Sequence, residues 1–320
     1  MSADLPTPDH PLRIGTRGSP LALAQAHETR DRLMAAHGLA EDAFRIVTIR
    51  TTGDAVQDRA LSAIGGKGLF TLEIEEALLH GRDPARENGI DIAVHSMKVM
   101  PTMLPEGLVL AAYLPRADVR DAFISPRHDG IAALPQGAVV GTSSLRRRAQ
   151  LLYRRPDIKV VEFRGTVQTR LRKLGDGVAE ATFLACAGLS RLGMEDEIRT
   201  AIEPEEMLPA VAQGAIGIEA RGGDDAVLAL LEPINDAATA RRLAAERAFL
   251  AGLDGSCRTP IGGLAILQDE TLWLRGEIVR PDGSARHATD RRGPVSDAAA
   301  MGTDAAAELR RRGGDGFFDL

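Results

Sequence analysis

The chain has 320 residues, of which 44% are hydrophobic and 26% charged, and a formal net charge of −6. This composition is typical of a globular protein, and the negative net charge argues against a general nucleic-acid binder. No apolar run approaches the roughly 20 residues of a membrane helix, the N-terminus shows no signal-peptide pattern, and two cysteines make no disulfide framework. We therefore expect a cytoplasmic protein with no membrane or nucleic-acid partner.

Short apolar runs alternate with helical patterns along most of the chain. Strands are predicted at 12–16, 44–53, 90–96, 107–114, 138–144, 158–165, 181–188 and 214–220. Helices are predicted at 19–38, 69–81, 143–155, 166–177, 236–253 and 295–314. Strands that alternate with helices indicate βαβ units and a mainly parallel sheet. After about residue 236 the pattern changes to a long helix and alternating runs such as 271–280, which indicates a small α+β domain.

The segment GTSSLRRRAQL, residues 141–151, runs from a predicted strand into a helix. Thr142 and Ser144 supply hydroxyl groups there, and Arg146 and Arg147 follow in the first helical turn. The helix dipole favours anions at this end, so it does not complement these cations. We therefore expect a bound anion near them, with a solvated basic face as the alternative.

Two further junctions repeat this arrangement. Arg17 and Ser19 lie in GTRGSPLALAQA, and Arg164 and Arg170 lie in EFRGTVQTRLRKL. The planar guanidinium of arginine bonds carboxylate oxygens in pairs. Ligands of open α/β sheets bind beyond the C-terminal ends of the strands, where these junctions fall. Three such junctions predict a ligand with several negative groups.

Two of the four lysines, Lys67 and Lys98, also lie in loops beside predicted strands or helices. The glycine-rich loop around Lys67 lacks the spacing of a nucleotide P-loop. His95, which precedes Lys98, is more simply a hydrogen-bonded structural residue. We see neither metal-ligand spacing nor a nicotinamide-binding glycine fingerprint, so we expect no metal and no nicotinamide cofactor.

The two cysteines differ in their surroundings. Cys186 stands in an apolar predicted strand, as expected of a buried core thiol. Cys257 stands in the polar loop GLDGSCRTPIGG beside Arg258, which would lower the pKa of its thiol and make it nucleophilic. We interpret Cys257 as a site of covalent attachment or catalysis, the alternative being a chance surface thiol.

Seven segments occur in an order that resembles the hydroxymethylbilane synthase (porphobilinogen deaminase) family from about Leu12 to the C-terminus. They are TRGSPLALAQA, GGKGLF, DIAVHSMK, GTSSLRRRAQL, FRGTVQTRL, LPAVAQGAIGIE and GSCRTPIGG. The resemblance implies an enzyme that joins four porphobilinogen units head to tail with loss of ammonia, then hydrolyses off the linear tetrapyrrole. It implies a dipyrromethane cofactor joined to Cys257 by a thioether. We expect a monomer whose partner is the small-molecule substrate.

The resemblance also assigns roles to the polar side chains. Each porphobilinogen carries an acetate and a propionate, so the growing chain gains two carboxylates at every step. Substrate carboxylates would be bound by Arg17, Ser19, Lys67, Arg164, Arg170, Arg191 and Gln213. The cofactor would be held by Lys98, Thr142, Ser144, Arg146 and Arg147, in addition to Cys257. The resemblance also places Lys98 at the catalytic position that precedes residue 99.

The implied fold is α/β with three domains. Two doubly wound lobes, similar to periplasmic binding proteins, would enclose the active cleft, and a small α+β domain would present the cysteine loop. The first lobe would comprise 12–114 with 214–233, the second 115–213, and the C-terminal domain 234–320.

One position departs from the family pattern. After HSMK the family has an aspartate, its principal catalytic group, whereas this chain has Val99 after Lys98. The aspartate would stabilise the positive charge that develops on the pyrrole as ammonia leaves, and valine has neither charge nor hydrogen-bonding atoms. We therefore expect an impaired enzyme. The alternative is a non-catalytic carboxylate-binding protein with the same two-lobed fold, against which the intact Cys257 loop argues.

Overall fold

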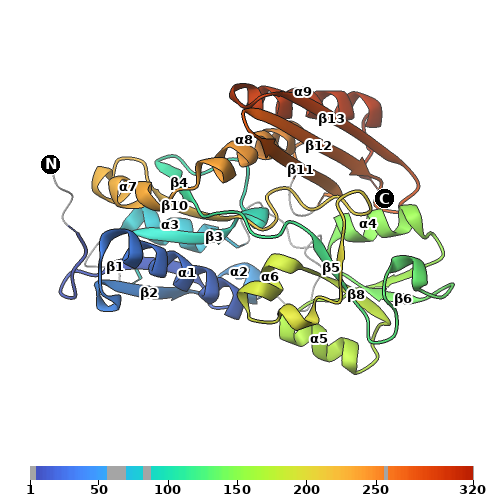
Figure 1. Ribbon diagram of the computed structural model, residues 1–320, viewed down its shortest axis with the longest axis horizontal. Coiled ribbons are helices and arrows are strands. Elements are labelled where there is room, and N and C mark those ends of the chain that lie inside the picture. The colour runs from blue at the N-terminus through green and yellow to red at the C-terminus, as the bar shows by residue number, and fades with distance from the viewer. Residues whose placement is uncertain (1–4, 56–69, 82–87, 256–258, 320) are drawn as a thin grey trace. The chain divides into compact units, whose positions relative to one another are not determined.

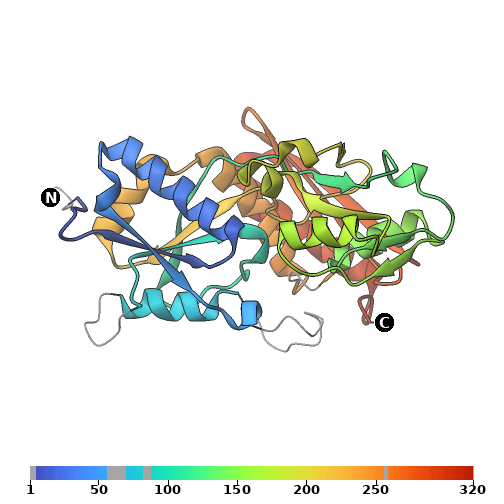
Figure 2. The ribbon, with the colours of Figure 1, turned by 90° about the horizontal axis from the view of Figure 1, so that it is seen from below.

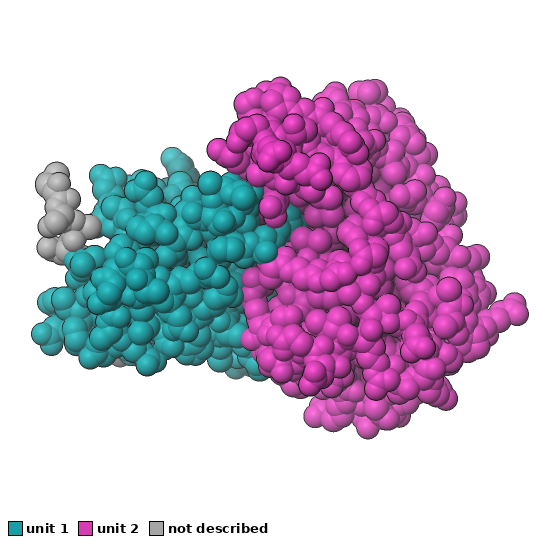
Figure 3. All heavy atoms as spheres, in the orientation of Figure 1, with its two compact units in different colours: residues 1–58, 65–116, 215–240 teal, residues 59–64, 117–214, 241–320 magenta. Residues whose placement is uncertain are grey.

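The computed structural model describes residues 5–55, 70–81, 88–255 and 259–319. These residues divide into two compact units, coloured separately in Figure 3. Unit 1 comprises the described parts of 1–58, 65–116 and 215–240, and unit 2 those of 117–214 and 241–320. Unit 1 contains one sheet and unit 2 contains two, among the residues described. The three-domain division expected from the sequence stays a prediction.

The sheet of unit 1 has the strand order β2-β1-β3-β10-β4 (Figure 1). Its strands are β1 (Leu12–Arg17), β2 (Phe44–Ile49), β3 (Ile92–Ser96), β4 (Leu108–Tyr113) and β10 (Ile216–Arg221). β1 pairs in parallel with β2 and β3, whereas β10 is antiparallel to β3 and β4. The expected mainly parallel sheet is therefore a mixed one. The reason is that β10 returns from a distant part of the chain and inserts between β3 and β4.

Helices cover both faces of this sheet, and Figure 2 shows α1 (Pro20–His37) and α3 (Leu72–His80) on opposite sides of it. Two separate apolar clusters form as a result, one containing Leu33 of α1 and the other Leu78 of α3. Successive strand residues point to opposite faces, so Ile92 packs into the first cluster and Ala93 into the second. The near-continuous apolar run of β3 thus reflects burial on both faces, as expected for a doubly wound lobe.

Shorter elements complete unit 1. They are η1 (Glu41–Ala43), α2 (Thr52–Ala55), η3 (Met97–Val99), α7 (Asp225–Leu231) and η6 (Glu232–Ile234). α1 begins after Ser19, whose hydroxyl accepts a hydrogen bond from the Ala22 backbone N–H at 3.3 Å, and ends at Gly38 with a φ of 66°. A hydroxyl N-cap and a left-handed glycine C-cap account for both ends of this helix.

The α/β sheet of unit 2 has the order β7-β6-β8-β5-β9. Its strands are β5 (Asp121–Ile124), β6 (Val139–Gly141), β7 (Lys159–Val161), β8 (Ala181–Ala185) and β9 (Thr200–Ile202). β6 is parallel to β7 and β8, and β5 is antiparallel to β8 and β9. β5 and β9 were not predicted; both are short, and each pairs only with strands that are remote in the sequence.

The helices of this part of unit 2 are η4 (Ile131–Ala133), α4 (Leu145–Arg154), α5 (Val167–Gly175), α6 (Cys186–Arg191) and η5 (Glu195–Glu197). The predicted strand 181–188 is wrong at its end, because β8 stops at Ala185 and Cys186 opens α6. Cys186 is nonetheless buried, as predicted, and burial raises the pKa of its thiol to about 11.

The second sheet of unit 2 is antiparallel and consists of β11 (Ile261–Gln268), β12 (Thr271–Val279) and β13 (Arg286–Pro294). The short helix η7 (Val295–Asp297) leads into α9 (Ala298–Gly313), which runs along β12 and β13 (Figure 1). The end of α8 (Ala237–Gly252) packs closely on β12. A Cβ at Gly276 would come within 2.5 Å of the Phe249 ring. This confirms the α+β character expected of the C-terminal region.

Candidate functional site

Two of the three predicted arginine junctions lie side by side in unit 2. β6 and β7 are parallel neighbours, so the β6–α4 and β7–α5 connections leave the sheet at the same edge. A Cβ at Gly141, the last residue of β6, would come within 2.4 Å of the Phe163 ring, so only glycine allows this close approach. The sequence prediction that these arginines gather at one edge of a sheet is confirmed for this pair of junctions.

The hydroxyl groups of the first junction organise the start of α4. Thr142 Oγ1 accepts a hydrogen bond from the Ser144 backbone N–H at 3.2 Å. Ser144 Oγ caps the helix by accepting from the Arg147 backbone N–H at 3.4 Å. These hydroxyls therefore position Arg146 and Arg147, and their expected contacts with a cofactor stay predictions.

One buried carboxylate, Asp121 at the start of β5, holds both arginines. Arg146 Nη2 lies 2.7 Å from Asp121 Oδ2, and Arg147 Nη2 lies 2.7 Å from Asp121 Oδ1. Burial by itself would raise the pKa of Asp121, but the charges and hydrogen bonds of the two arginines hold it well below the usual range. Sequence reasoning missed Asp121, although an acid directly before the apolar residues AFI was a visible signal. One carboxylate between two guanidinium groups leaves an excess positive charge.

Arg164 and Arg170 add to that excess. Burial is the main cause that lowers the pKa of Arg170 to about 10, and repulsion from Arg147 and Arg164 is the next. Repulsion of this kind requires the three guanidinium groups to lie near one another. Arg170 Nε donates to the Gly165 carbonyl at 3.0 Å, which ties the side chain to its own junction. We call Arg147, Arg164 and Arg170 the arginine cluster.

A strained turn brings Gln213 to the same carboxylate. Gln213 Nε2 donates to Asp121 Oδ1 at 2.9 Å and to the Val119 carbonyl at 2.8 Å. The preceding residue, Ala212, has a φ of 61°, which is unfavourable for a residue with a Cβ. Its backbone N–H donates to Glu246 Oε2 at 2.7 Å, so a buried acid of α8 holds the turn in place. Arg191 Nη2 reaches this turn as well, donating to the Gly214 carbonyl at 3.0 Å.

Unit 1 has its own polar strand ends. β1 and β3 are parallel neighbours, so Arg17 at the end of β1 and Lys98 and Val99 in η3 follow the same edge of the sheet. The Arg17 guanidinium lies 4.2 Å from the centre of the Phe70 ring. Val99 is half-buried. Lys67 and Cys257, by contrast, lie outside the described residues.

Beneath this edge is a buried acidic cluster. His95 Nε2 lies 3.1 Å from Glu219 Oε2, which confirms the prediction that His95 is hydrogen-bonded. Glu75 of α3 is buried nearby, and burial, together with repulsion from Glu219, raises its pKa. Glu219 is hydrogen-bonded to His95, and Glu75 interacts electrostatically with both.

Among the residues described, no group of three or more His, Cys, Asp or Glu side chains could hold a metal ion. No helix within the same residues is both long and apolar enough to cross a membrane.

The chain is similar to known porphobilinogen deaminases over nearly its whole length. Residues 12–229 match the family model described as porphobilinogen deaminase, dipyrromethane cofactor binding domain, and residues 240–311 match that of the porphobilinogen deaminase C-terminal domain. The porphobilinogen deaminase of Paracoccus denitrificans is 68% identical over 315 residues, which cover 98% of both chains. That of Nitrobacter winogradskyi is 57% identical over 96% of this chain and 95% of its own.

Solved structures with a related arrangement include two periplasmic proteins. An arginine-specific periplasmic binding protein of Salmonella typhimurium aligns with 72% of this chain and 93% of its own at 13% identity and a TM-score of 0.39. A periplasmic substrate-binding protein from Coxiella burnetii aligns with 72% of this chain and 94% of its own at 14% identity and a TM-score of 0.42. Similarities this distant support no argument about function.

Proposed function

The chain belongs to the porphobilinogen deaminase family, and on that premise we propose that it joins four porphobilinogen units head to tail. Each addition releases one ammonia, and hydrolysis then frees the linear tetrapyrrole, as in a hydroxymethylbilane synthase. Members of the family are transferases of tetrapyrrole and heme biosynthesis that use a dipyrromethane cofactor. Porphobilinogen is the substrate that we assign to the arginine-rich strand ends.

The arginine cluster is the observation that carries this proposal. Burial and the neighbouring charges of Arg147 and Arg164 lower the pKa of Arg170 to about 10, so its charged form is under strain. An anion placed among like charges relieves such repulsion. Each porphobilinogen brings two carboxylates, and a chain of pyrroles brings two more with every unit. A ligand of this kind adds negative charge beside guanidinium groups that repel one another.

The same donors fit a cofactor that carries carboxylates, because guanidinium groups and hydroxyls at strand ends are carboxylate-binding groups. When bound, dipyrromethane supplies the pyrrole carbon to which the first porphobilinogen is joined. We assign its thioether bond to Cys257, and its carboxylates to Lys98, Thr142, Ser144, Arg146 and Arg147. We assign substrate carboxylates to Arg17, Ser19, Lys67, Arg164, Arg170, Arg191 and Gln213.

Val99 makes the proposed enzyme slow. The family's carboxylate at this position would act where positive charge develops, and a fixed charge there stabilises the transition state more than the bound substrate. Valine forfeits that interaction, whereas the arginines that bind substrate are present. We therefore propose that turnover is reduced more than binding.

Intact mass spectrometry of the purified protein and of two cysteine variants tests the proposal. We expect the mass of a dipyrromethane on the parent and on Cys186→Ser, but not on Cys257→Ser, and porphobilinogen consumption only where that mass is present. Cys186→Ser is the matched control because it removes the buried thiol. A second candidate function, non-catalytic carboxylate binding, is raised by Val99. A parent that binds porphobilinogen but carries no added mass and consumes no substrate would favour it.

We further propose three domains, 12–114 with 214–233, 115–213 and 234–320, in a monomeric cytoplasmic protein. The two matched family models meet between residues 229 and 240, which supports the boundary at 234. Limited proteolysis that cuts first near 234, and a size-exclusion mass close to 34.1 kDa, are the expected results. A dimer mass at micromolar concentration would contradict the monomer.

A further inference from the structure

A row of buried polar side chains extends from Asp121 toward the antiparallel sheet of unit 2. Arg146 Nη1 donates to Gln150 Oε1 at 2.9 Å and to the Leu208 carbonyl at 3.0 Å. Gln150 Nε2 donates in turn to the Leu208 carbonyl at 2.9 Å and to Glu277 Oε1. Arg146, Gln150 and Glu277 are all buried. A residue of β12 is therefore linked through one amide to an arginine of the candidate site.

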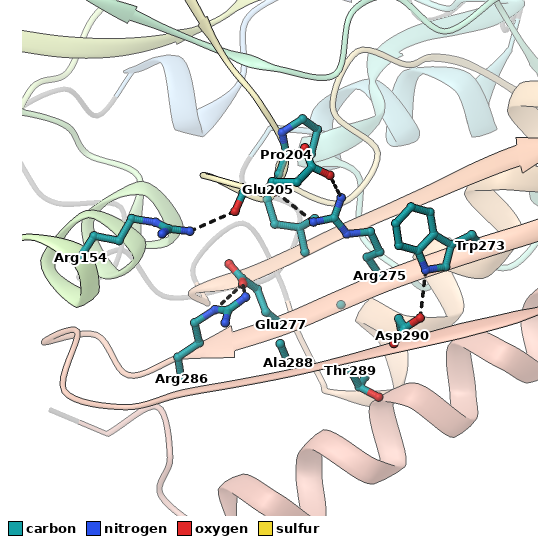
Figure 4. A pocket seen from close by; sticks show the side chains of 12 residues that line it. Arg154, Pro204, Glu205, Trp273, Arg275, Glu277, Arg286, Ala288, Thr289 and Asp290 are labelled. Atoms are coloured by element: carbon teal, nitrogen blue, oxygen red, sulfur yellow. Dashed lines mark hydrogen bonds and ion pairs between the residues drawn. The ribbon is translucent and has the colours of Figure 1, made fainter. Parts of the chain in front are cut away.

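Glu277 also lines a cavity of about 300 Å³ on the face of β12 and β13 (Figure 4). Arg286 of β13 points toward Glu277 in this view, and its Nε donates to Glu277 Oε2 at 2.7 Å. Glu205 lines the same cavity and pairs with Arg275 instead. The cavity therefore contains two glutamates with arginine partners, of which Glu277 is the one hydrogen-bonded to Gln150.

The orientation of the Arg146 guanidinium depends on these contacts. Its buried Nε has no hydrogen-bond partner. The group is held by Asp121 at Nη2, and by Gln150 and the Leu208 carbonyl at Nη1. If the Gln150 oxygen were turned away, a single backbone carbonyl would hold Nη1.

Glu277 acts with the Leu208 carbonyl, which accepts from the same amide nitrogen, to fix which end of the Gln150 amide faces Arg146. An ionised carboxylate only accepts hydrogen bonds, so it draws the amide nitrogen toward itself and leaves the amide oxygen for the guanidinium. A neutral amide at 277 accepts or donates equally well, so that only the Leu208 carbonyl and Arg146 would then oppose the reversed orientation. In that orientation the Gln150 nitrogen would face the Arg146 N–H groups, which is a contact between two donors.

Glu277 also adds a negative charge where one carboxylate serves two arginines. Its attraction favours the charged form of Arg146, which burial disfavours. Buried ionised groups need both paired charge and satisfied hydrogen bonds, and loss of one partner leaves the other at a disadvantage.

We propose that Glu277 is a positioning residue for Arg146, acting through Gln150, and that it thereby sets the affinity of the site for the carboxylates of dipyrromethane and of the growing pyrrole chain. This inference rests on the proposed function. Glu277 lies in the antiparallel sheet β11–β13 of the proposed cofactor-bearing region. One hydrogen-bonded network therefore joins this sheet to the α/β sheet of unit 2.

The test compares E277Q with the parent, each in the Val99→Asp background so that rates are measurable. We expect KM for porphobilinogen to rise about three- to tenfold, because a hydrogen bond to a charged group is lost or reversed. The fraction of purified protein that carries the dipyrromethane mass should fall, and kcat should change less than twofold. A purely structural role would lower the melting temperature and leave KM and the loaded fraction unchanged, which would overturn the proposal.

E205Q is the matched control. It makes the same substitution in the same cavity and removes a glutamate with an arginine partner, but Glu205 is exposed and bonds to Arg275. We expect parent values of KM and loaded fraction for E205Q. Equal losses in E205Q and E277Q would mean that general electrostatics of the cavity, and not the link to Arg146, explains the effect, and would overturn the proposal.

The double variant Q150E/E277Q tests the link itself. It reverses donor and acceptor between positions 150 and 277 and again presents an acceptor to Arg146, while it gives up the hydrogen bond from position 150 to the Leu208 carbonyl. We expect KM within about threefold of the parent, a better value than E277Q alone. If E277Q does not fold, the double variant is the test instead. A double variant that folds but carries no dipyrromethane overturns the proposal. A parent that itself carries none contradicts the proposed function instead, so the two failures are distinguishable.

Discussion

The two α/β sheets follow one plan but differ in the charge that they bury. In each, three parallel strands are joined by an antiparallel fourth and by a fifth beyond it. Unit 1 buries two carboxylates, Glu75 and Glu219, around one histidine. Unit 2 buries two arginines around one carboxylate, Asp121. The same strand order thus surrounds different buried charges, since these depend on a few side chains and not on the order of the strands.

The largest expected effect on this comparison comes from Asp121→Asn. The substitution leaves two buried guanidinium groups without a countercharge and should lower the free energy of unfolding by about 3–5 kcal/mol. The fold holds the pKa of Asp121 well below 3.8, the value for a free aspartate. The ionised Asp121 therefore stabilises the fold fully above pH 3.8, and this stabilisation is lost as the pH falls from 3.8 toward the lowered pKa. Urea unfolding of the parent and the variant at pH 7 measures the loss of stability, and the same experiment at pH 3 measures its dependence on pH.

Asp157→Asn is the control for that experiment. Asp157 pairs with Arg155 at 2.8 Å, but both side chains are accessible to solvent. Exposed pairs contribute little. A similar loss of stability in both variants would show that burial of the Asp121 network has no special role.

Val99→Asp should give the next largest effect, on rate and not on stability. A preorganised charge beside a developing charge is typically worth about 2.7–4 kcal/mol, or roughly 100- to 1,000-fold in rate, and we expect porphobilinogen consumption to rise at least about tenfold. The melting temperature should change little. Val99→Asn provides a polar side chain without charge and should not match the gain. Equal rates for all three proteins would mean that another acid performs this role.

Arg170→Gln tests whether the repulsion in unit 2 reflects a binding site. Removing one charge-assisted hydrogen bond should weaken porphobilinogen binding by about ten- to a hundredfold, or about 1.5–3 kcal/mol. Arg172→Gln, on the exposed side of the same helix, should bind as the parent does. Isothermal titration of both variants gives the comparison. Unchanged affinity in Arg170→Gln would remove Arg170 from the site.

The smallest expected effect is a gain in stability from Glu75→Gln in unit 1. Burial and the nearby Glu219 raise the pKa of Glu75 above 4.5, so its ionisation destabilises the fold as the pH rises through that range. The glutamine removes this penalty, and we expect about 1 kcal/mol more stability at pH 8, the size of one net hydrogen bond, and less gain at pH 4. Glu76→Gln, exposed on the same helix, is the control. A gain that did not grow with pH would contradict this explanation.

Local sequence was sufficient to locate the arginine junctions. A strand that ends in glycine, a hydroxyl cap and a helix lie within about ten consecutive residues, so their order along the chain determines their geometry. The N-caps at Ser19, Ser144 and Thr166 follow the same local logic. The family resemblance likewise depends on short motifs, and the comparisons confirm it.

Tertiary structure decided which charges meet. Asp121 lies 25 residues from Arg146 in the chain, and Glu277 lies 127 residues from Gln150. Periodicity describes which face of an element is buried but carries no information about which distant element covers that face. The short strands β5 and β9, and the antiparallel insertion of β10, were hidden for the same reason. The order of the main elements and the places where arginines follow a strand were therefore determined by the sequence itself, whereas the pairing of buried charges arose only when remote strands packed together.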